Sequence, residues 1–333
     1  MKIKSADICC GLSYGDEGKG KLVAFLSRTN SYDYVCRWNG GHNAGHTIYV
    51  NGNKYKTNLI PSGVFYGIKS YIGPNCVLNV NKFFKELEYL KGHGFDTSLV
   101  SVSPKCSVIT EQHLSENIEN KKFSEYSTNT GIAPCYRDKY GRTGLLAKDD
   151  TLLKKYIFNG EISGDILCEG AQGFWLDINH GNYPYTTSSH TLPYDACSLG
   201  FPPRIIRNIY GACKIYDTRV GIDPDFPDTL FNDEELSKLI DIGEEYGVTT
   251  GRKRKTNWLN LDKLIYAINV SGTNIVCFSK IDIIQKLGIY KLFYSNIIEE
   301  FDSFDSMKQF INSTIESRCV IDKINYSGSV ETI

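Results

Sequence analysis

The sequence predicts an α/β protein with a central, largely parallel β-sheet that is flanked by helices. Short apolar runs alternate along the chain with segments of helical periodicity, which is the pattern of repeated strand and helix units. Glycine-rich segments follow the first two apolar runs. In a parallel sheet such segments are loops beyond the carboxyl ends of strands, where ligands bind. Both observations favour one sheet with a ligand site along that edge.

The chain opens with a strand, a loop and a helix. Residues 6–10 form the first apolar run, and a glycine-rich loop follows it. Apolar residues then recur at helical spacing, which predicts a helix over residues 21–27 that packs on the sheet. Residues 34–38 form the second apolar run, directly ahead of the second glycine-rich segment.

Later segments supply the remaining elements. We expect further strands in five short runs, at residues 70–72, 107–110, 165–168, 207–215 and 274–278. We expect helices over three periodic segments, at residues 79–91, 234–240 and 261–270. The polar section 111–150 and the stretch 187–203 are interpreted as excursions or active-site loops rather than linkers. No domain boundary is evident, so residues 1–333 are expected to form a single catalytic domain.

Size and composition limit the classes of protein that fit. A chain of 333 residues with 41% hydrophobic content can bury a large core. The formal net charge is only −1 and the basic residues are scattered, so no nucleic-acid partner is expected. The eleven cysteines form no C-x-x-C pair, which favours a reduced, cytoplasmic setting. The first apolar run is too short for a signal peptide or a membrane span, so no membrane partner is expected.

The first glycine-rich segment has the composition of a phosphate-binding loop. It reads Gly15-Asp16-Glu17-Gly18-Lys19-Gly20-Lys21. Small residues let backbone amides approach an anion, and Lys19 and Lys21 would neutralise its charge. The segment departs from the P-loop pattern because Gly20 follows Lys19, so no Ser or Thr hydroxyl is placed to hold magnesium. A metal ion would need another ligand, and Asp16 is the nearest candidate.

The second glycine-rich segment strengthens this interpretation. It reads Gly40-Gly41-His42-Asn43-Ala44-Gly45-His46-Thr47. A glycine and lysine loop alone is often only a turn, and a lone histidine is usually structural. Two such segments behind successive apolar runs favour an anion site that includes His46. The cluster Arg252-Lys253-Arg254, which follows Thr249-Thr250-Gly251, is interpreted as an anion clamp rather than a solvated basic face.

Together, these segments resemble the adenylosuccinate synthetase family, in particular its compact archaeal and viral branches. Further matches occur in the family's order along the chain: Pro61-Ser62-Gly63, Glu169-Gly170-Ala171-Gln172-Gly173, Asp177, His180-Gly181, Tyr183-Pro184, Thr187-Ser188-Ser189, Thr218-Arg219-Val220-Gly221, Gly247-Val248-Thr249-Thr250-Gly251-Arg252-Lys253-Arg254, Thr256 and Lys280-Ile281-Asp282. The resemblance implies a P-loop-NTPase-related fold with inserted active-site loops. It also implies a GTP-dependent ligase that joins L-aspartate to inosine monophosphate (IMP), giving adenylosuccinate, GDP and phosphate.

The resemblance implies three catalytic residues. Asp16 would take the proton from purine N1, which makes O6 nucleophilic toward the γ-phosphate of GTP. His46 would donate a hydrogen bond or proton at O6 and at the transferring group. Lys19 would offset the charge that develops there. Asp16 and the carbonyl of Gly45 would hold Mg²⁺, the implied cofactor.

The same match implies three sets of binding residues. Those expected to bind GTP are Gly15, Glu17, Gly18, Lys19, Gly20, Lys21, Gly45, His46, Thr47, Lys280, Asp282, Ser327 and Gly328. Those expected to bind the monophosphate are Asp16, Asn43, Thr128, Arg142, Gln172, Thr187 and Arg252. Those expected to bind aspartate are Thr249, Thr250, Arg252 and Arg254. Asp282 would accept hydrogen bonds from guanine, and Arg142 would reach the site of a neighbouring subunit, which implies a homodimer.

Departures from the family pattern leave alternatives for the acceptor. Leu12-Ser13-Tyr14 precedes Gly15 where relatives more often have a Gln-Trp pair, residues 129–134 are less glycine-rich, and residues 190–203 lack the expected small residues. A second hypothesis is therefore a 2-aminoadenylosuccinate synthetase that uses dGMP or GMP with ATP, dATP or GTP. The presence of Asp16 favours IMP. A third hypothesis is a nucleotide-binding regulator without catalysis, against which the combination of Asp16, Lys19 and His46 argues.

Overall fold

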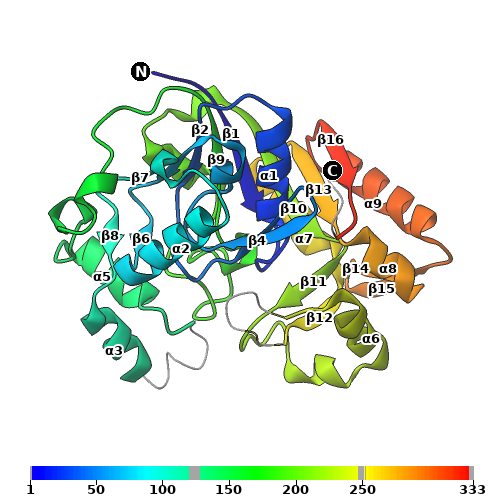
Figure 1. Ribbon diagram of the computed structural model, residues 1–333. Helices are drawn as coiled ribbons and strands as arrows, with labels where there is room; N and C mark the ends of the chain where they lie inside the picture. Colours follow the sequence, from blue (N-terminus) through cyan, green and yellow to red (C-terminus); the bar gives the residue numbers. More distant parts are fainter. Residues whose placement is uncertain (1, 120–127, 247–250, 252, 330–333) are drawn as a thin grey trace.

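The central element is a parallel sheet whose strand order places the first strand near its middle. The computed structural model describes residues 2–119, 128–246, 251 and 253–329. Within these residues, eight strands form the sheet in the order β16-β13-β10-β1-β9-β2-β5-β7 (Figure 1). Every neighbouring pair in this sheet is parallel. The predicted α/β class is confirmed.

The strands of the central sheet largely match the predicted apolar runs. They are β1 (Ile3–Gly11), β2 (Tyr34–Arg37), β5 (Lys69–Ile72), β7 (Val100–Val102), β9 (Gly164–Glu169), β10 (Ile206–Lys214), β13 (Ile275–Ser279) and β16 (Lys323–Tyr326). The main helices are α1 (Lys19–Thr29), α2 (Val80–Gly92), α3 (Glu111–Glu119), α5 (Ile132–Gly141), α6 (Glu234–Gly243), α7 (Leu261–Ser271), α8 (Ile281–Leu287) and α9 (Phe304–Arg318). None of the described helices is long and apolar enough to cross a bilayer.

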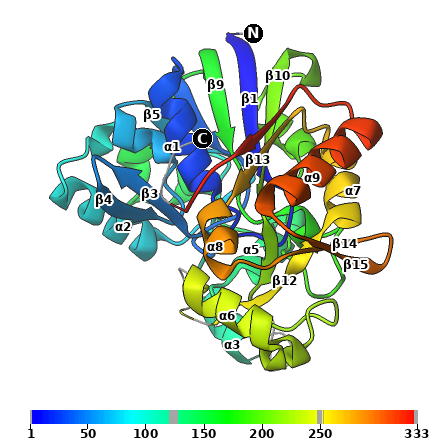
Figure 2. The ribbon, with the colours of Figure 1, turned by 90° about the vertical axis from the view of Figure 1, so that its right-hand side faces the viewer.

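Successive residues of β1 face opposite sides of the sheet, as strand geometry requires. Ala6, Ile8 and Cys10 are buried in a core cluster that also contains residues of α7 and α9. Cys9 points the other way, into a cluster with Leu22 and other residues of α1. Figure 2 shows the strands between α1 on one side and α7 with α9 on the other. Both faces are covered, which explains why the strand sequences are apolar runs rather than alternating patterns.

Polar side chains cap three of the helices at their amino termini. Asn79 and Asn260 each accept a hydrogen bond, at 2.9 Å, from the backbone amide three residues later, at the starts of α2 and α7. Asp233 does the same at the start of α6. Such caps satisfy amides that have no partner within the helix. The first helix differs, because Gly18 precedes it with φ 89° and offers no side chain.

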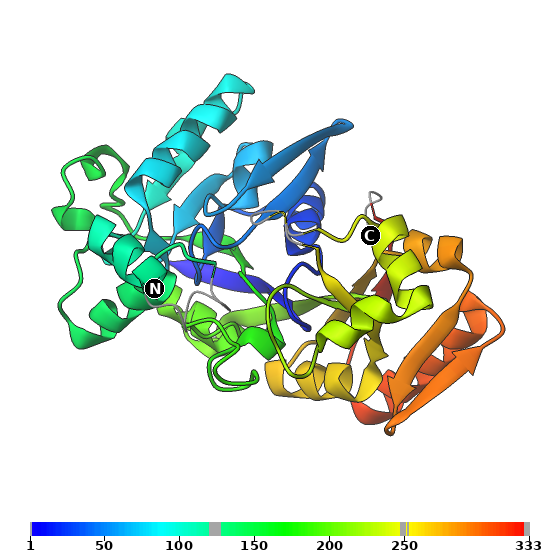
Figure 3. The same cartoon turned by 90° about the horizontal axis from the view of Figure 1, so that it is seen from below.

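Two smaller elements extend beyond the carboxyl edge of the main sheet. One is the hairpin of β3 (His46–Val50) and β4 (Asn53–Thr57). The other is a second sheet of β11 (Tyr216–Arg219), β12 (Lys255–Asn260), β14 (Tyr290–Tyr294) and β15 (Ile297–Phe301). Figure 3 shows, from below, that the hairpin and α6 lie on different sides of the region in which the strands of the main sheet end.

Two segments differ from what their sequence indicates. Of the expected strand at residues 107–110, only β8 (Ser107–Val108) forms, and it pairs with β6 (Val77–Leu78) outside the main sheet. The polar section 111–150 contains α3 and α5 rather than only loops. Helix α3 buries just His113 and Asn117, so it shows little of the apolar stripe that would have revealed it.

Candidate functional site

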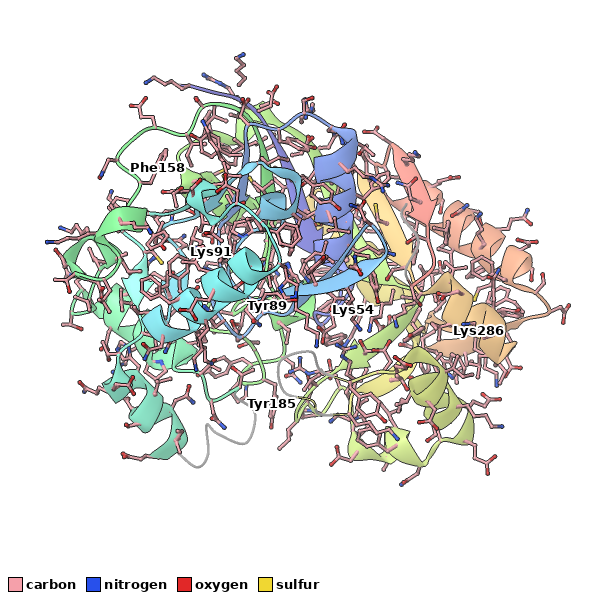
Figure 4. All side chains as sticks on the ribbon, viewed as in Figure 1. Lys54, Tyr89, Lys91, Phe158, Tyr185 and Lys286 are labelled. Atoms are coloured by element: carbon pink, nitrogen blue, oxygen red, sulfur yellow. The ribbon has the colours of Figure 1, made fainter. Side chains whose placement is uncertain are left out.

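A cavity of about 610 Å³ opens at the carboxyl edge of the main sheet. Its wall includes the loops that follow β1, β2, β9, β11 and β13, the end of β10, the β3–β4 hairpin and residues of α8. Lys54 of the hairpin, Tyr185 and Lys286 of α8 line it from three separate parts of the chain and are labelled in Figure 4. The position agrees with the general rule for parallel sheets.

A buried carboxylate holds the first glycine-rich loop in shape. Glu17 accepts hydrogen bonds from the backbone amides of Ser13 (3.2 Å) and Gly15 (2.9 Å), and it pairs with Lys19 at 2.5 Å. Its side chain is 1% exposed. The carboxylate is therefore directed at its own loop rather than at the open cavity. Helix α1 begins at Lys19, so its amino terminus and free amides face the cavity and favour an anion there.

Steric contact explains why Gly20 stands where a P-loop has a Ser or Thr. A Cβ at Gly20 would lie 2.7 Å from the Cβ of His46, which is too close for two carbon atoms. The second glycine-rich segment thus packs directly on the start of α1. His46 occupies the space that a side chain after Lys19 would need. This packing explains why no Ser or Thr follows Lys19.

The imidazole of His46 lies between a carboxylate and a guanidinium. Nδ1 contacts Glu169, and Nε2 lies 3.3 Å from Nη1 of Arg37. Glu169 also accepts hydrogen bonds from the backbone amide and hydroxyl of Ser62, at 2.7 and 2.8 Å. Burial, and then the positive charge of Arg37, lower the pKa of His46 although Glu169 raises it. Because a guanidinium can only donate, Nε2 accepts from Arg37 and Nδ1 donates to Glu169.

Asp16 reaches across the cavity to the loop that follows α6. Its backbone has φ 60°, and its side chain is 29% exposed. Oδ2 lies 3.0 Å from Nε of Arg254, whose Nη1 lies 2.5 Å from Oε2 of Glu245. The residues expected to act as base and as aspartate clamp are therefore an ion pair in this structure.

A second buried carboxylate, Glu245, gathers cations behind the cavity wall. Lys214 donates to its Oε2 at 2.9 Å, Tyr216 donates to Oε1 at 2.6 Å, and Lys280 lies 3.8 Å from Oε1. Although burial raises it, the cations Lys214 and Arg254 hold the pKa of Glu245 far below its usual range. Burial lowers the pKa of Lys214 to about 8, and Glu245 opposes this shift. Three cations and one anion thus share a region from which water is largely excluded.

The residues that follow β16 reach the same cavity. Lys21 donates to Oγ of Ser327 at 3.0 Å and to the carbonyl of Gly328 at 2.7 Å. Asp282 accepts hydrogen bonds from the amide and hydroxyl of Ser329, at 2.7 and 2.8 Å. Residues separated by three hundred positions therefore meet at one end of the cavity.

The structure brings most of the predicted site residues to this cavity. Its wall includes Gly15, Asp16, Glu17, Gly18, Lys19, Gly20, Lys21, Asn43, Gly45, His46, Thr47, Thr128, Gln172, Thr187, Arg254, Lys280 and Asp282. Ser327 and Gly328 lie behind it, against Lys21. Arg142 is exposed at the end of α5 and does not line the cavity. Thr249, Thr250 and Arg252 lie outside the described residues.

Sequence reasoning assigned no role to three charged residues at the site. Lys214 and Arg219 line the cavity, and Glu245 supports its wall. Lys214 is a charged residue inside an apolar run, which is itself a signal because buried charges are rare without a partner. Glu245 follows a helix and precedes the loop of Arg254, and nothing in its local pattern distinguishes it from a surface glutamate.

The donor set fits a magnesium ion that is shared with phosphate groups. Mg²⁺ is usually held by one or two carboxylates together with substrate phosphates and water. Asp16 offers a partly exposed carboxylate, and Gly45 contributes to the same cavity wall. Among the described residues, no group of three His, Cys, Asp or Glu side chains could enclose a metal by itself. The arrangement therefore suits a cation that arrives with a nucleotide.

Fold and site together define a nucleotide-binding α/β protein of the P-loop-related type. The family model for adenylosuccinate synthetase matches residues 8–163 and 152–295. Adenylosuccinate synthetase of Thermodesulfovibrio yellowstonii is 38% identical, with 89% of this chain and 83% of that protein covered. The enzyme of Borrelia turicatae is 36% identical, with 85% and 78% covered. This chain belongs to the adenylosuccinate synthetase family.

Solved structures agree with this assignment. Fully ligated adenylosuccinate synthetase from Plasmodium falciparum superposes with a TM-score of 0.82 at 26% identity, over 98% of this chain and 97% of that one. The succinoaminodeoxyadenylate synthetase of cyanophage S-2L, bound to dGMP and dATP, superposes with a TM-score of 0.76 at 20% identity, over 98% and 93%. At that identity the second likeness concerns the fold alone.

Replacing Gly173 with alanine should distort the first glycine-rich loop. A Cβ there would lie 2.2 Å from Oε1 of Glu17 and 2.6 Å from the amide nitrogen of Gly15. We expect Gly173→Ala to destabilise the protein by about 1–3 kcal/mol, as overpacking does, and to weaken nucleotide binding at least tenfold. Thermal unfolding and calorimetric titration with GTP would measure both effects.

Gly92→Ala is the matched control for this substitution. Gly92 is in α2, and a Cβ there meets nothing within 4 Å. An unchanged or slightly higher melting temperature is expected, because alanine is the better helix former by about 0.5–1 kcal/mol. Equal nucleotide affinity in the Gly173→Ala variant and the unaltered protein would contradict the role given to Glu17.

Proposed function

We propose that this protein is a GTP-dependent ligase that joins L-aspartate to IMP and forms adenylosuccinate, GDP and phosphate. The observation that carries the proposal is the meeting of three chemically distinct groups in one cavity. They are the anion-binding start of α1 at Lys19, the carboxylate and guanidinium pair of Asp16 and Arg254, and the base-reading segment at Asp282. A nucleoside triphosphate, a purine monophosphate and an amino-acid carboxylate each need one of these groups.

The proposed chemistry has two steps. Asp16 removes the proton from N1 of IMP, and O6 attacks the γ-phosphorus of GTP, so that GDP leaves. The amine of aspartate then attacks C6 and loses a proton, the C6–O6 bond breaks, and phosphate departs with that proton. Lys19 and the amides at the start of α1 stabilise the transferring charge. Arg254 binds an aspartate carboxylate, together with Thr249, Thr250 and Arg252.

His46 and Asp16 must exchange partners during this reaction. Nε2 of His46 faces Arg37, so a donor role at O6 requires that the purine oxygen replaces Arg37 at this nitrogen. Glu169 at Nδ1 would then stabilise a protonated ring. Asp16 must likewise leave Arg254 before it can serve the purine. Substrate binding thus frees both Asp16 and Arg254 for their separate tasks.

Mg²⁺ is the proposed cofactor, with Asp16 and the carbonyl of Gly45 as protein ligands. When bound, it would polarise the triphosphate and offset its charge. In monophosphate binding, we assign roles to Asn43, Thr128, Gln172 and Thr187 beside Asp16 and Arg252. Among the described residues, no donor contacts the buried Oε1 of Gln172, so a substrate hydroxyl or amine could satisfy this atom.

We further propose a single cytoplasmic catalytic domain that acts as a homodimer. The eleven cysteines are all free, as expected in a reducing compartment. Arg142 is exposed at the end of α5 and does not line the cavity of its own chain, which suits a role in the site of a partner. The alternative acceptors dGMP and GMP stay in competition with IMP, because residues Ser13 and Tyr14 differ from the usual family pair.

A matrix of substrates would test the reaction. We expect aspartate-dependent release of phosphate and formation of adenylosuccinate with IMP and GTP in the presence of Mg²⁺. IMP, dIMP, GMP and dGMP should each be combined with GTP, ATP and dATP, and products should be identified by mass. Turnover of dGMP without turnover of IMP would overturn the assignment of the acceptor. Nucleotide binding without phosphate release in any combination would favour the regulator.

Asp16→Asn tests the proposed base. The amide keeps the size of the side chain but cannot take a proton, so phosphate release should fall by about 100-fold or more. GTP binding measured by calorimetry without Mg²⁺ should change little, because the start of α1 is unaltered and the proposed role of Asp16 in holding the metal is not involved. Turnover close to that of the unaltered protein would contradict the base assignment.

Mixing two inactive variants tests the shared site. If Arg142 acts in the neighbouring site, Arg142→Leu and Asp16→Asn subunits should restore activity when they exchange, because a mixed dimer contains one site with both residues intact. About a quarter of the full activity is expected at equal ratios if exchange is complete, since half of the dimers are mixed and each has one good site. Absence of any recovery, with exchange verified by differently tagged subunits, would count against the cross-subunit role.

A further inference from the structure

Glu245 joins the two ends of the loop that carries Arg254. The backbone amide of Arg254 donates to the carbonyl of Glu245 at 2.9 Å, and Tyr246 and Lys253 form an antiparallel bridge. The side chains repeat this connection, because Nη1 of Arg254 donates to Oε2 of Glu245 at 2.5 Å. Backbone and side chain therefore close the same stem.

The carboxylate of Glu245 is also fixed to the main fold. Lys214, at the end of β10, and Tyr216, at the start of β11, donate to its two oxygens at 2.9 and 2.6 Å. The side chain of Glu245 is fully buried. Because its lone pairs are occupied from the sheet side as well as from the loop side, the carboxylate can move little. It transfers the rigidity of the sheet edge to Arg254.

This contact leaves part of the Arg254 guanidinium available. Nη1 is held by Glu245, whereas Nε faces Asp16 at 3.0 Å. A guanidinium carries five N–H donors in a fixed plane, so holding one nitrogen orients the others. When Asp16 turns to the purine, the Nε side is released while the Nη1 side stays anchored. A carboxylate of aspartate could then take the position that Asp16 leaves.

We propose that Glu245 is a positioning residue for the aspartate step, holding Arg254 by Nη1 so that its remaining donors meet a substrate carboxylate. This inference rests on the proposed function. Glu245 would act on the substrate only through Arg254. Glu245 lies behind the cavity wall and does not touch the substrate. Lys280, which also lies near the carboxylate of Glu245, donates to the carbonyl of Gly243 at 2.9 Å. The position of Lys280 therefore depends less on Glu245.

Glu245→Gln should mainly affect aspartate. The glutamine amide has one oxygen and one NH₂ group, so it can accept hydrogen bonds on one side only. Tyr216 loses its acceptor in one orientation, and Arg254 and Lys214 lose theirs in the other. We expect the KM for aspartate to rise at least tenfold. The KM for the accepted monophosphate should stay within about twofold, because its proposed contacts lie on other loops. Equal KM for aspartate in this variant and the unaltered protein would overturn the proposal.

Asp241→Asn is the matched control. Asp241 is an exposed carboxylate on α6, four residues before Glu245, and it does not line the cavity. Its loss changes the net charge by the same amount, so unchanged kinetics would show that charge alone is not the cause. Thermal unfolding of both variants would show whether they fold. If Glu245→Gln does not fold, Tyr216→Phe removes one anchor of the same carboxylate and should raise the KM for aspartate two- to fivefold.

A double-mutant cycle separates positioning from general damage. Arg254→Lys keeps the positive charge but loses the planar guanidinium that can bind a carboxylate through two N–H groups. This substitution alone should raise the KM for aspartate. If Glu245 acts through Arg254, adding Glu245→Gln to Arg254→Lys should raise this KM by less than about twofold more. Multiplicative effects of the two substitutions would overturn the proposal. Failure of the unaltered protein to ligate aspartate would instead refute the proposed function, so the two failures are distinguishable.

Discussion

Buried carboxylates that hold cations in fixed positions are the constraint on which the site depends. A cavity that collects phosphates and carboxylates needs several positive groups, and these repel one another where water is scarce. Glu17 holds Lys19, and Glu245 holds Lys214 and Arg254. Each carboxylate is almost fully buried, so loss of one partner would leave an uncompensated charge, which typically costs about 3–5 kcal/mol. These two carboxylates are thus as necessary as the cations that face the ligand.

The same constraint shapes the two glycine-rich loops. Glu17 accepts hydrogen bonds from backbone amides of its loop and pairs with Lys19. Gly173, in a neighbouring loop, lacks the side chain that would clash with the Glu17 carboxylate. His46 packs on Gly20, which removes the place for the hydroxyl residue of a standard P-loop. A change of metal ligand, from a hydroxyl after the lysine to Asp16 before it, follows from this packing in the proposed mechanism.

Much of the fold could be predicted because its signals are local. The apolar runs of β1, β2, β9 and β13, and the second half of β10, are largely buried, so they stand out in the sequence. The short strand β7, the edge strand β16 and the second sheet were not predicted. Their residues are mixed in polarity, and their pairing depends on segments far away in the chain. Tertiary pairing, rather than local pattern, decides such elements.

The site shows the same division. The loops rich in glycine, lysine and histidine could be recognised from the sequence. The structure places Lys19, His46 and Lys280 at one cavity. Glu245 could not be found in this way, because its importance lies in partners on β10, β11 and the following loop rather than in its neighbours along the chain. A residue that supports others is visible only when the distances are known.

The strand order has a consequence for the synthesis of the chain on the ribosome. The strand β1 lies between β9 and β10, so neither of its edges is covered until β9, at residues 164–169, has been made. The contact of Lys21 with Ser327 and Gly328 comes later still. This end of the cavity is therefore completed only when residues some three hundred positions after Lys21 have been translated, and until β9 and β10 are made the nascent chain must keep the apolar strand β1 from wrong pairings.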